Sequence, residues 1–468
     1  MKRRLLGVAA LAVLAAGCGG GGGSSASDAA TLVPASTVAY ITIDTNRTSG
    51  QIGNAKSILD KFPFAPTVYR GLKQELDRFS VLGPETDFAV LTVGRKTTYV
   101  ALTQPKNEKA LDEKLDASKP KELHRQVDGW TAFSESSAAL AEVGTKGPRL
   151  AAVPTYVKAF TTVPGSGHAL VRAYASSRGL GTLVRNSVTG LLSPRTGALS
   201  PGNGALAALP KTWVSLALSA DNGALKLEAH AKENIAPSTT QSLAGQLPSG
   251  SILAASFVGT RRGSTTLPKA ATSELQALSR RIGTNLVPFI DTLRGPVILY
   301  VRPGAPLPEV TIAAKPPKPQ AALKAIKAFA TRLTAGATKP VPTKVPGGTL
   351  DKLNLGALVL WVGELGTGEI VISDSQNALA ELKGADGRLS GDGVFKQAQS
   401  ESGLPSANSG FLFVDAVHLM PIIEGFAQQA NAKIPPSVEA DLRPVQSLLI
   451  YASRNGPVGS FVTFLQTS

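Results

Sequence analysis

The segments "GWTAFSESSAALAEV" (129–143) and "GEIVISDSQNALAEL" (368–382) are the strongest indication of the architecture, because one closely repeats the other. In each segment a short β-type run follows a glycine and ends at a Ser-acidic-Ser triplet. An alanine-rich stretch typical of a helix then begins. Similarity over a long interval between two such segments predicts an internal repeat of the whole chain.

Further pairs of segments recur in the same order on either side of this pair. Both halves place a Gly-Pro before a strand, at Gly83-Pro84 and Gly295-Pro296, and both end in a strand pair with Asn-Gly between, at 222–223 and 455–456. Asn-Gly tolerates the positive φ angles of tight hairpin turns. The matched segments are 32–44 with 246–258, 82–93 with 293–301, 97–103 with 309–315, 105–117 with 317–333, 167–175 with 409–417, and 213–231 with 448–466.

The sequence therefore predicts an α+β fold made of two tandem homologous repeats, residues 32–235 and 243–468. The boundary lies in "KENIAPSTTQS" (232–242), which is polar and interrupted by proline. Adjacent strand pairs mixed with amphipathic helices indicate a mainly antiparallel sheet covered on one face by helices. Since the halves are predicted to superpose, we expect Gly83-Pro84 to meet Gly295-Pro296 and Asn222-Gly223 to meet Asn455-Gly456.

The first seventeen residues have the layout of a secretory signal peptide. Lys2, Arg3 and Arg4 precede the apolar run Leu5–Ala16, which is too short to span a bilayer comfortably. Leu14-Ala15-Ala16-Gly17-Cys18 resembles the bacterial lipobox, with Ala15 where leucine is more usual. The resemblance implies that Cys18 is acylated and that the chain is cut between Gly17 and Cys18. The alternative is an ordinary secretory signal with an incidental cysteine.

Residues 18–31 are expected to be a lipidated cysteine and its tether. Two or more acyl chains anchor a protein firmly, and the Gly/Ser segment 19–27 is typical of a flexible linker. The expected location is thus the outer face of the bacterial cell membrane. Cys18 is the only cysteine, so no other thiol is left for a disulfide, a metal site or a nucleophile.

Composition indicates globular domains and restricts the possible partners. The 468 residues are 43% hydrophobic and 17% charged, with a formal net charge of +15. A basic exported chain is attracted to anionic lipid head groups and envelope polymers, and an envelope protein is a further possible partner. No nucleic acid is expected, because the positive charges are dispersed and no aromatic-studded basic strand is present.

Local sequence motifs predict no catalytic residue, metal site or cofactor. The four histidines, His124, His168, His230 and His418, form no metal-binding spacing. Ser166 in "PGSGH" (164–168) lacks the Gly-x-Ser-x-Gly elbow of hydrolases. We therefore expect no histidine within about 3.2 Å of both a Ser or Thr hydroxyl and an orienting carboxylate, allowing for looser spacing without substrate.

Three further features have simple structural interpretations. The triplets 134–136 and 373–375 are expected to cap helices, with Ser373 and Gln376 forming a capping box. "GELGTGE" (363–369) is expected to be a hairpin turn. The basic amphipathic helix 317–333 is expected to pack Leu323, Ile326, Phe329 and Leu333 on a sheet, the alternative being a membrane surface.

The opening "LVPASTVAYITID" (32–44), the Gly-Pro strand pair and the "FSESSAAL"/"ISDSQNAL" segments resemble a bacterial family known as domain of unknown function 3352. The resemblance implies an exported chain beginning just after a membrane anchor, and it implies no activity and no site residues. The expected role is a non-catalytic binding or scaffold protein of the envelope. Two alternatives stay open: a hydrolase with its site between the repeats, and a carrier of an apolar ligand.

Overall fold

A computed structural model of the chain divides it into two compact units, Met1–Ile235 with Asn455–Ser468, and Ala236–Arg454. The signal segment, Cys18 and the tether up to residue 27 lie outside the described residues. The structure describes residues 28–70, 80–94, 96–118, 121–162, 169–177, 179, 213–232, 243–259, 276–277, 280, 295–304, 307–333, 339–356, 358–366, 368–429 and 432–468.

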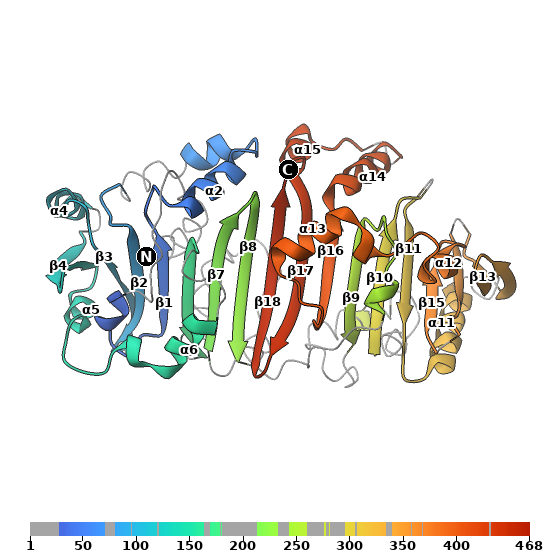
Figure 1. Ribbon diagram of the computed structural model, residues 1–468, viewed down its shortest axis with the longest axis horizontal. Helices are drawn as coiled ribbons and strands as arrows, with labels where there is room; N and C mark the ends of the chain where they lie inside the picture. The colour runs from blue at the N-terminus through green and yellow to red at the C-terminus, as the bar shows by residue number, and fades with distance from the viewer. Residues whose placement is uncertain are drawn as a thin grey trace. The chain divides into compact units, whose positions relative to one another are not determined.

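The first unit is built on an antiparallel sheet in the order β4-β5-β3-β2-β1-β6-β7-β8-β18 (Figure 1). The expected α+β class with a mainly antiparallel sheet is confirmed. The strands are β1 (Ala39–Asp44), β2 (Glu85–Val93), β3 (Lys96–Thr103), β4 (Leu123–Val127), β5 (Trp130–Ser134), β6 (Val171–Ser176), β7 (Trp213–Asp221), β8 (Ala224–Lys232) and β18 (Val458–Thr467).

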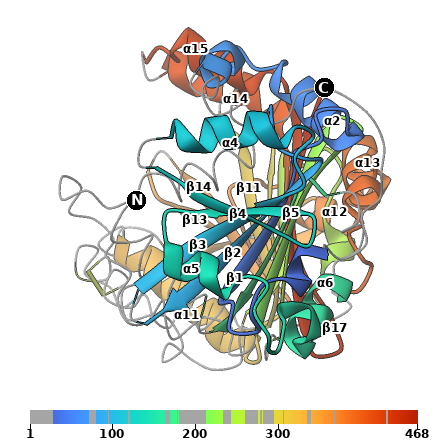
Figure 2. The same ribbon diagram turned by 90° about the vertical axis from the view of Figure 1, so that its left-hand side faces the viewer.

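Helices cover both faces of this sheet, not one face as the sequence predicted. Leu111 and Leu115 of α4 pack with Phe88, whereas Ala139 and Leu140 of α5 pack with Ala89. Phe88 and Ala89 are neighbours in β2, so their side chains lie on opposite faces. Figure 2 shows α4 and α5 on opposite sides of β4 and β5. The helices are α2 (Gly50–Leu59), α4 (Glu108–Asp116), α5 (Ser137–Glu142) and α6 (Pro154–Thr162), with short 3₁₀ turns at Asp28–Thr31 and Leu150–Ala152.

The second unit has its own antiparallel sheet, in the order β12-β13-β14-β15-β11-β10-β9-β16-β17. The predicted "GELGTGE" hairpin is confirmed, since β14 and β15 pair across it. The strands are β9 (Leu253–Gly259), β10 (Gly295–Arg302), β11 (Glu309–Ala314), β12 (Val341–Val345), β13 (Gly348–Asn354), β14 (Val359–Glu364), β15 (Ile370–Ser373), β16 (Gly410–Asp415) and β17 (Val445–Asn455).

The amphipathic helix expected at 317–333 is α11, and it packs on the sheet as predicted. Leu323 and Ile326 are buried with Val297 and Val362 of the strands beneath. On the other face, Phe395 of α13 packs with Phe411 and Phe413. The helices are α11 (Pro319–Leu333), α12 (Ala378–Leu382), α13 (Gly393–Ser402), α14 (Ala416–Gln429) and α15 (Pro436–Leu442), with 3₁₀ turns at Ala244–Gln246 and Leu389–Gly391.

The two sheets share a strand order. The first contains β5-β3-β2-β1-β6-β7 and the second contains β15-β11-β10-β9-β16-β17, and the chain visits these strands in the same succession. Equivalent backbone bonds fix the register: Val38 N–H donates to the Val90 carbonyl, and Ile252 N–H donates to that of Val301, 3.0 and 2.8 Å apart. Position 90 therefore corresponds to position 301.

Both turn motifs are displaced by one residue from the predicted match. Counted from the Val90 and Val301 bonds, Gly295 occupies the position of Pro84, not that of Gly83. Asn222 (φ 48°) and Gly223 (φ 78°) form the predicted two-residue turn between β7 and β8. Between β17 and β18, however, the connecting residues are Gly456 and Pro457, because proline has no amide hydrogen for strand pairing.

The compact units also differ from the predicted repeat boundaries at the end of the chain. β18 pairs with β8 along nearly its full length, from Val458 opposite Lys232 to Gln466 opposite Ala224. This pairing is why residues 455–468 belong to the first unit.

Candidate functional site

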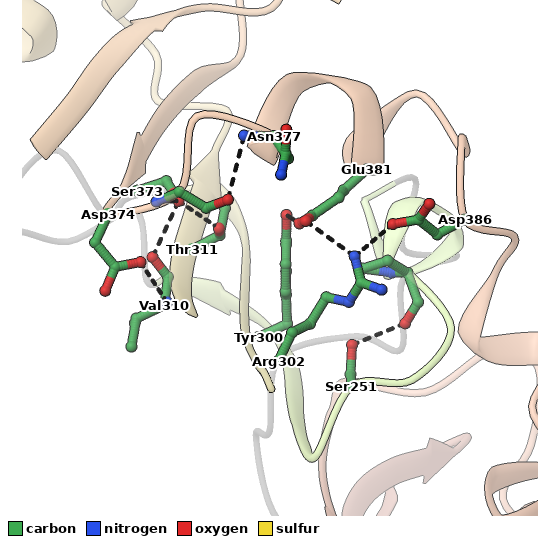
Figure 3. Close-up of polar contacts among 12 residues, drawn as sticks. Ser251, Tyr300, Arg302, Val310, Thr311, Ser373, Asp374, Asn377, Glu381 and Asp386 are labelled. Carbon is green, nitrogen blue, oxygen red and sulfur yellow. Dashed lines mark hydrogen bonds and ion pairs between the residues drawn. The ribbon is translucent and has the colours of Figure 1, made fainter. Parts of the chain in front are cut away.

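The second unit buries an ionic network beneath α12. Tyr300 and Arg302 are two residues apart in β10, so both side chains lie on the face that α12 covers. The Tyr300 hydroxyl donates to Glu381 Oε2 at 2.8 Å, and Arg302 Nη1 lies 2.9 Å from Glu381 Oε1 (Figure 3). One carboxylate thus accepts from a phenol and a guanidinium at once.

Burial makes these partners necessary. The Glu381 side chain is 3% exposed, and a buried carboxylate is costly unless it is paired and hydrogen-bonded. Arg302 also contacts the more exposed Asp386. Burial raises the pKa of Tyr300 above its usual value, and Glu381 raises it further. The phenol therefore stays protonated as a hydrogen-bond donor.

The triplet 373–375 lies between the end of β15 and the start of α12, and it does not form the predicted capping box. Ser373 Oγ lies 2.7 Å from Thr311 Oγ1 and accepts from Ser375 N–H, while Asp374 accepts from Val310 N–H (Figure 3). The helix begins later, at Ala378, so its N-cap is Asn377, which makes no side-chain capping bond. Ser373 is too far upstream to bond the first helical amides.

The equivalent triplet of the first unit does cap its helix, as predicted. Ser136 is the N-cap of α5 and accepts from Ala139 N–H at 3.2 Å. Ser134 accepts from Ser136 N–H and donates to the Tyr99 carbonyl at 2.6 Å. These serine hydroxyls are engaged by backbone groups.

The first unit holds a different set of buried charges, at the start of β2. Asp87 is fully buried and accepts from the Thr42 hydroxyl at 2.7 Å. Arg172 of β6 lies on the same face, 3.5 Å from Glu85 and over the Phe160 ring at 5.3 Å. The guanidinium is thus held between a carboxylate and an aromatic face, an arrangement that stabilises a desolvated cation.

A small cavity adjoins Arg172. Phe160, Arg172, Ser215 and Ala217 help to line it, and its volume is about 10 Å³. Ser215 Oγ and the Tyr156 hydroxyl are buried and have no hydrogen-bond partner among the residues that the structure describes. A space of this size fits one water molecule, which could satisfy Ser215, and it is too small for a substrate.

His230 comes nearest to a catalytic arrangement. Its Nδ1 lies 3.0 Å from Ser460 Oγ of β18, and its Nε2 lies 3.9 Å from Glu228 Oε2. The serine distance is shorter than 3.2 Å, and the carboxylate distance exceeds it by a margin that looser spacing without substrate would cover. Ser460, however, lies within a strand, not on the sharp strand-to-helix turn that exposes a nucleophilic serine.

The remaining histidines are spread over both units. His124 pairs with Asp112 at 3.2 Å, and His418, with a side chain 65% exposed, pairs with Asp415 at 2.7 Å. His168 and Ser166 lie outside the described residues. Within the described part of the chain, no three His, Cys, Asp or Glu side chains are placed to hold a metal ion.

The buried charged groups were missed from the sequence. Asp87 interrupts the otherwise apolar run of β2, and a charge at a core position was the one available signal. Glu381 gave no such signal, because glutamate in a short helix is ordinarily exposed. Its partners come from a distant strand.

Comparisons with known proteins establish no family. No family model matches the chain, and no curated protein matches it. Solved structures entitled crystal forms I and III of TP0453 are 11% identical, with TM-scores of 0.26 and 0.25. The matches cover 46% and 45% of this chain and 82% of each of those chains. Among the described residues, no helix has both the length and the apolar character to cross a membrane.

Proposed function

We propose that the mature chain is a lipid-anchored protein on the outer face of a bacterial cell membrane, where it serves as a non-catalytic binding or scaffold protein. The observation that carries the proposal is the segment Leu14–Cys18 after a charged start and an apolar run. Cys18 is the attachment point and Gly17 precedes the cut. The Gly/Ser tether gives the folded units reach from the membrane.

The body of the protein, we further propose, arose by duplication of one α+β repeat of the family known as domain of unknown function 3352. The shared strand order supports the duplication. A detail outside the strands also supports it. Arg149 forms an isolated β-bridge with Pro34, and its side chain donates to the Leu32 carbonyl. In the same way, Arg388 forms an isolated β-bridge with Pro248, and its side chain donates to the Gln246 carbonyl.

The pairing of β8 with β18 supports the same proposal. If Asn222-Gly223 corresponds to Gly456-Pro457, then Glu228 corresponds to Val462, and these two residues pair directly. The register runs symmetrically outward from them, to Ala224 with Gln466 and Lys232 with Val458. Equivalent edges of two homologous copies pair in this self-complementary way in isologous dimers.

A binding role fits the polar groups better than catalysis does. Glu381 accepts from the Tyr300 hydroxyl and pairs with Arg302, and the serines of the two triplets bond to the backbone or to Thr311. A catalytic group needs a free proton-transfer or nucleophilic atom facing a reacting atom.

Substitution of the anchor residue tests the proposal. Cys18→Ser should abolish incorporation of labelled fatty acid and move the protein out of the membrane fraction, or leave it as uncleaved precursor. Wild-type protein should carry a diacylglyceryl group on residue 18 by mass spectrometry. Unchanged fractionation of the variant, together with an unmodified wild-type Cys18, contradicts the anchor.

The contact of Ser460 with His230 favours one alternative, a hydrolase. In that case wild-type protein should be labelled by a fluorophosphonate probe at Ser460, and Ser460→Ala should abolish hydrolysis of a p-nitrophenyl ester. The binding proposal expects no labelling of Ser460, because Ser460 lies within a strand and not on the sharp turn that exposes a nucleophilic serine.

A further inference from the structure

Positive charge is concentrated in one part of the second unit. Residues 309–364, from the start of β11 to the end of β14, contain eight lysines or arginines and three acidic residues, Glu309, Asp351 and Glu364. The stretch in the same place of the first unit, residues 96–127 from the start of β3 to the end of β4, contains seven basic and five acidic residues. The charge is therefore segregated, not evenly spread.

Three of these lysines are exposed on one side of the second sheet. Leu323 and Ile326 bury the inner side of α11, whereas Lys324 of this helix and Lys318, which directly precedes it, are exposed. Lys344 of β12 lies opposite Thr349, two residues from Asp351, which pairs with Lys327 of α11. Lys344 thus projects from the face that α11 covers.

These three lysines have no acidic partner among the described residues. Lys327 is neutralised by Asp351, but Lys318, Lys324 and Lys344 make no ion pair in that part of the chain. Solubility needs net charge but not its concentration in one region, so the segregation points to a ligand of opposite charge.

We propose that α11 and β12 form a docking surface for a linear phosphodiester polyanion of the cell envelope. This inference rests on the proposed function, because it takes the envelope as the setting. Several phosphates in a row would be neutralised by lysines from two elements, with release of counterions. Lys318, Lys324 and Lys344 supply the contacts.

A polymer fits this surface better than a bilayer does. An interfacial helix inserts its apolar side among lipid chains. The apolar side of α11 is occupied by β14 and β15, and the exposed positions of the helix within its described side chains are Gln320, Ala321, Lys324 and Ala328. The surface therefore offers charge without an apolar side to insert.

Binding of long-chain inorganic polyphosphate to the full mature chain carrying Cys18→Ser tests the surface. The triple variant Lys318→Gln/Lys324→Gln/Lys344→Gln should bind at least about tenfold more weakly, and the slope of log affinity against log salt should fall by about 2. The control, Lys106→Gln/Lys109→Gln/Lys114→Gln, removes the same charge from the region of α4. It should stay within about twofold of the parent.

Equal losses in the two triple variants overturn the proposal, because net charge alone would then explain binding. Tighter binding to phosphatidylglycerol vesicles or duplex DNA than to polyphosphate overturns it in favour of a lipid or nucleic-acid partner. The protein tested lacks the acylated cysteine, so a failure of the anchor proposal leaves this result unaffected, and the reverse also holds.

Discussion

The two units place buried charges at opposite ends of one strand pair. In the first unit the charged end of β2 carries Asp87, and the other end carries Ala89 and Leu91 in an apolar core. In the second unit the register puts Ile298 in the place of Asp87, and puts Tyr300 and Arg302 in the places of Ala89 and Leu91.

The partners change together with these residues. Glu142, which matches Glu381 in sequence, is exposed, and Leu91 stands in the place of Arg302 in the first unit. Glu381, by contrast, is buried against Arg302. Phe411 occupies the place of Arg172 where Ile298 replaces Asp87. The lesson is that this backbone accepts buried charges only as complete sets, because an unpaired buried charge is far more costly than an apolar pair.

The largest expected effect comes from breaking the set of the first unit. Arg172→Met should lower the free energy of unfolding by about 3–5 kcal/mol, because Glu85 loses its buried partner. Urea unfolding measures the change. Arg443→Met, which breaks the exposed pair with Glu439, should cost less than about 0.5 kcal/mol. Similar losses in both variants would contradict the account.

The pH dependence of folding stability should differ in sign between a buried glutamate of the first unit and a half-buried one of the second. Burial raises the pKa of Glu228, but His230 and Lys226 lower it by more, so its folded pKa is depressed. Its contribution is present above the ordinary pKa and is lost as the pH falls through the folded value. Glu228→Gln should therefore destabilise the protein by about 1–3 kcal/mol near neutral pH, and the difference from wild type should shrink between about pH 5 and pH 3.

Glu309 of the second unit provides the opposite case. Burial raises its pKa, so its contribution is present at low pH and is lost as the pH rises through the folded value. Glu309→Gln should make the protein at least as stable as wild type near neutral pH, and the difference should shrink in acid, where Glu309 is itself neutral. Urea titrations at both pH values measure the two slopes, and slopes of the same sign would refute this distinction.

The smallest expected effect separates the two short helices. Ser136→Ala removes the capping bond of α5 and should cost about 1 kcal/mol. Asn377→Ala, at the N-cap of α12, should change stability by less than about 0.3 kcal/mol, because Asn377 makes no capping bond. An equal loss at both positions would mean that the serine bond is not the cause.

The sequence predicted features that depend on neighbouring residues. The turn at Asn222-Gly223, the hairpin at 363–369, the packing side of α11 and the cap at Ser136 all follow from local chemistry. The alignment of β10 with β2 could not be predicted from local chemistry. Matching Gly-Pro with Gly-Pro shifts β10 by one residue, and such a shift moves Tyr300 to the opposite face of the sheet.

Contacts between distant segments were also beyond local reasoning. Glu381 becomes buried only because Arg302 and Tyr300 approach from another strand. The second layer of helices was missed for a related reason. Alternation along a strand is weak when both of its faces are buried, as in β5, where every residue is buried.

A double-mutant cycle on Arg302 and Glu381 tests the central claim, that buried charges are retained here only as complete sets. Arg302→Leu, which restores the residue found at position 91, and Glu381→Ala should each destabilise the protein by about 3–5 kcal/mol. The double variant should be less destabilised than the sum by at least about 2 kcal/mol, because the second change removes the charge that the first left unpaired. Additive losses within about 0.5 kcal/mol would contradict the claim.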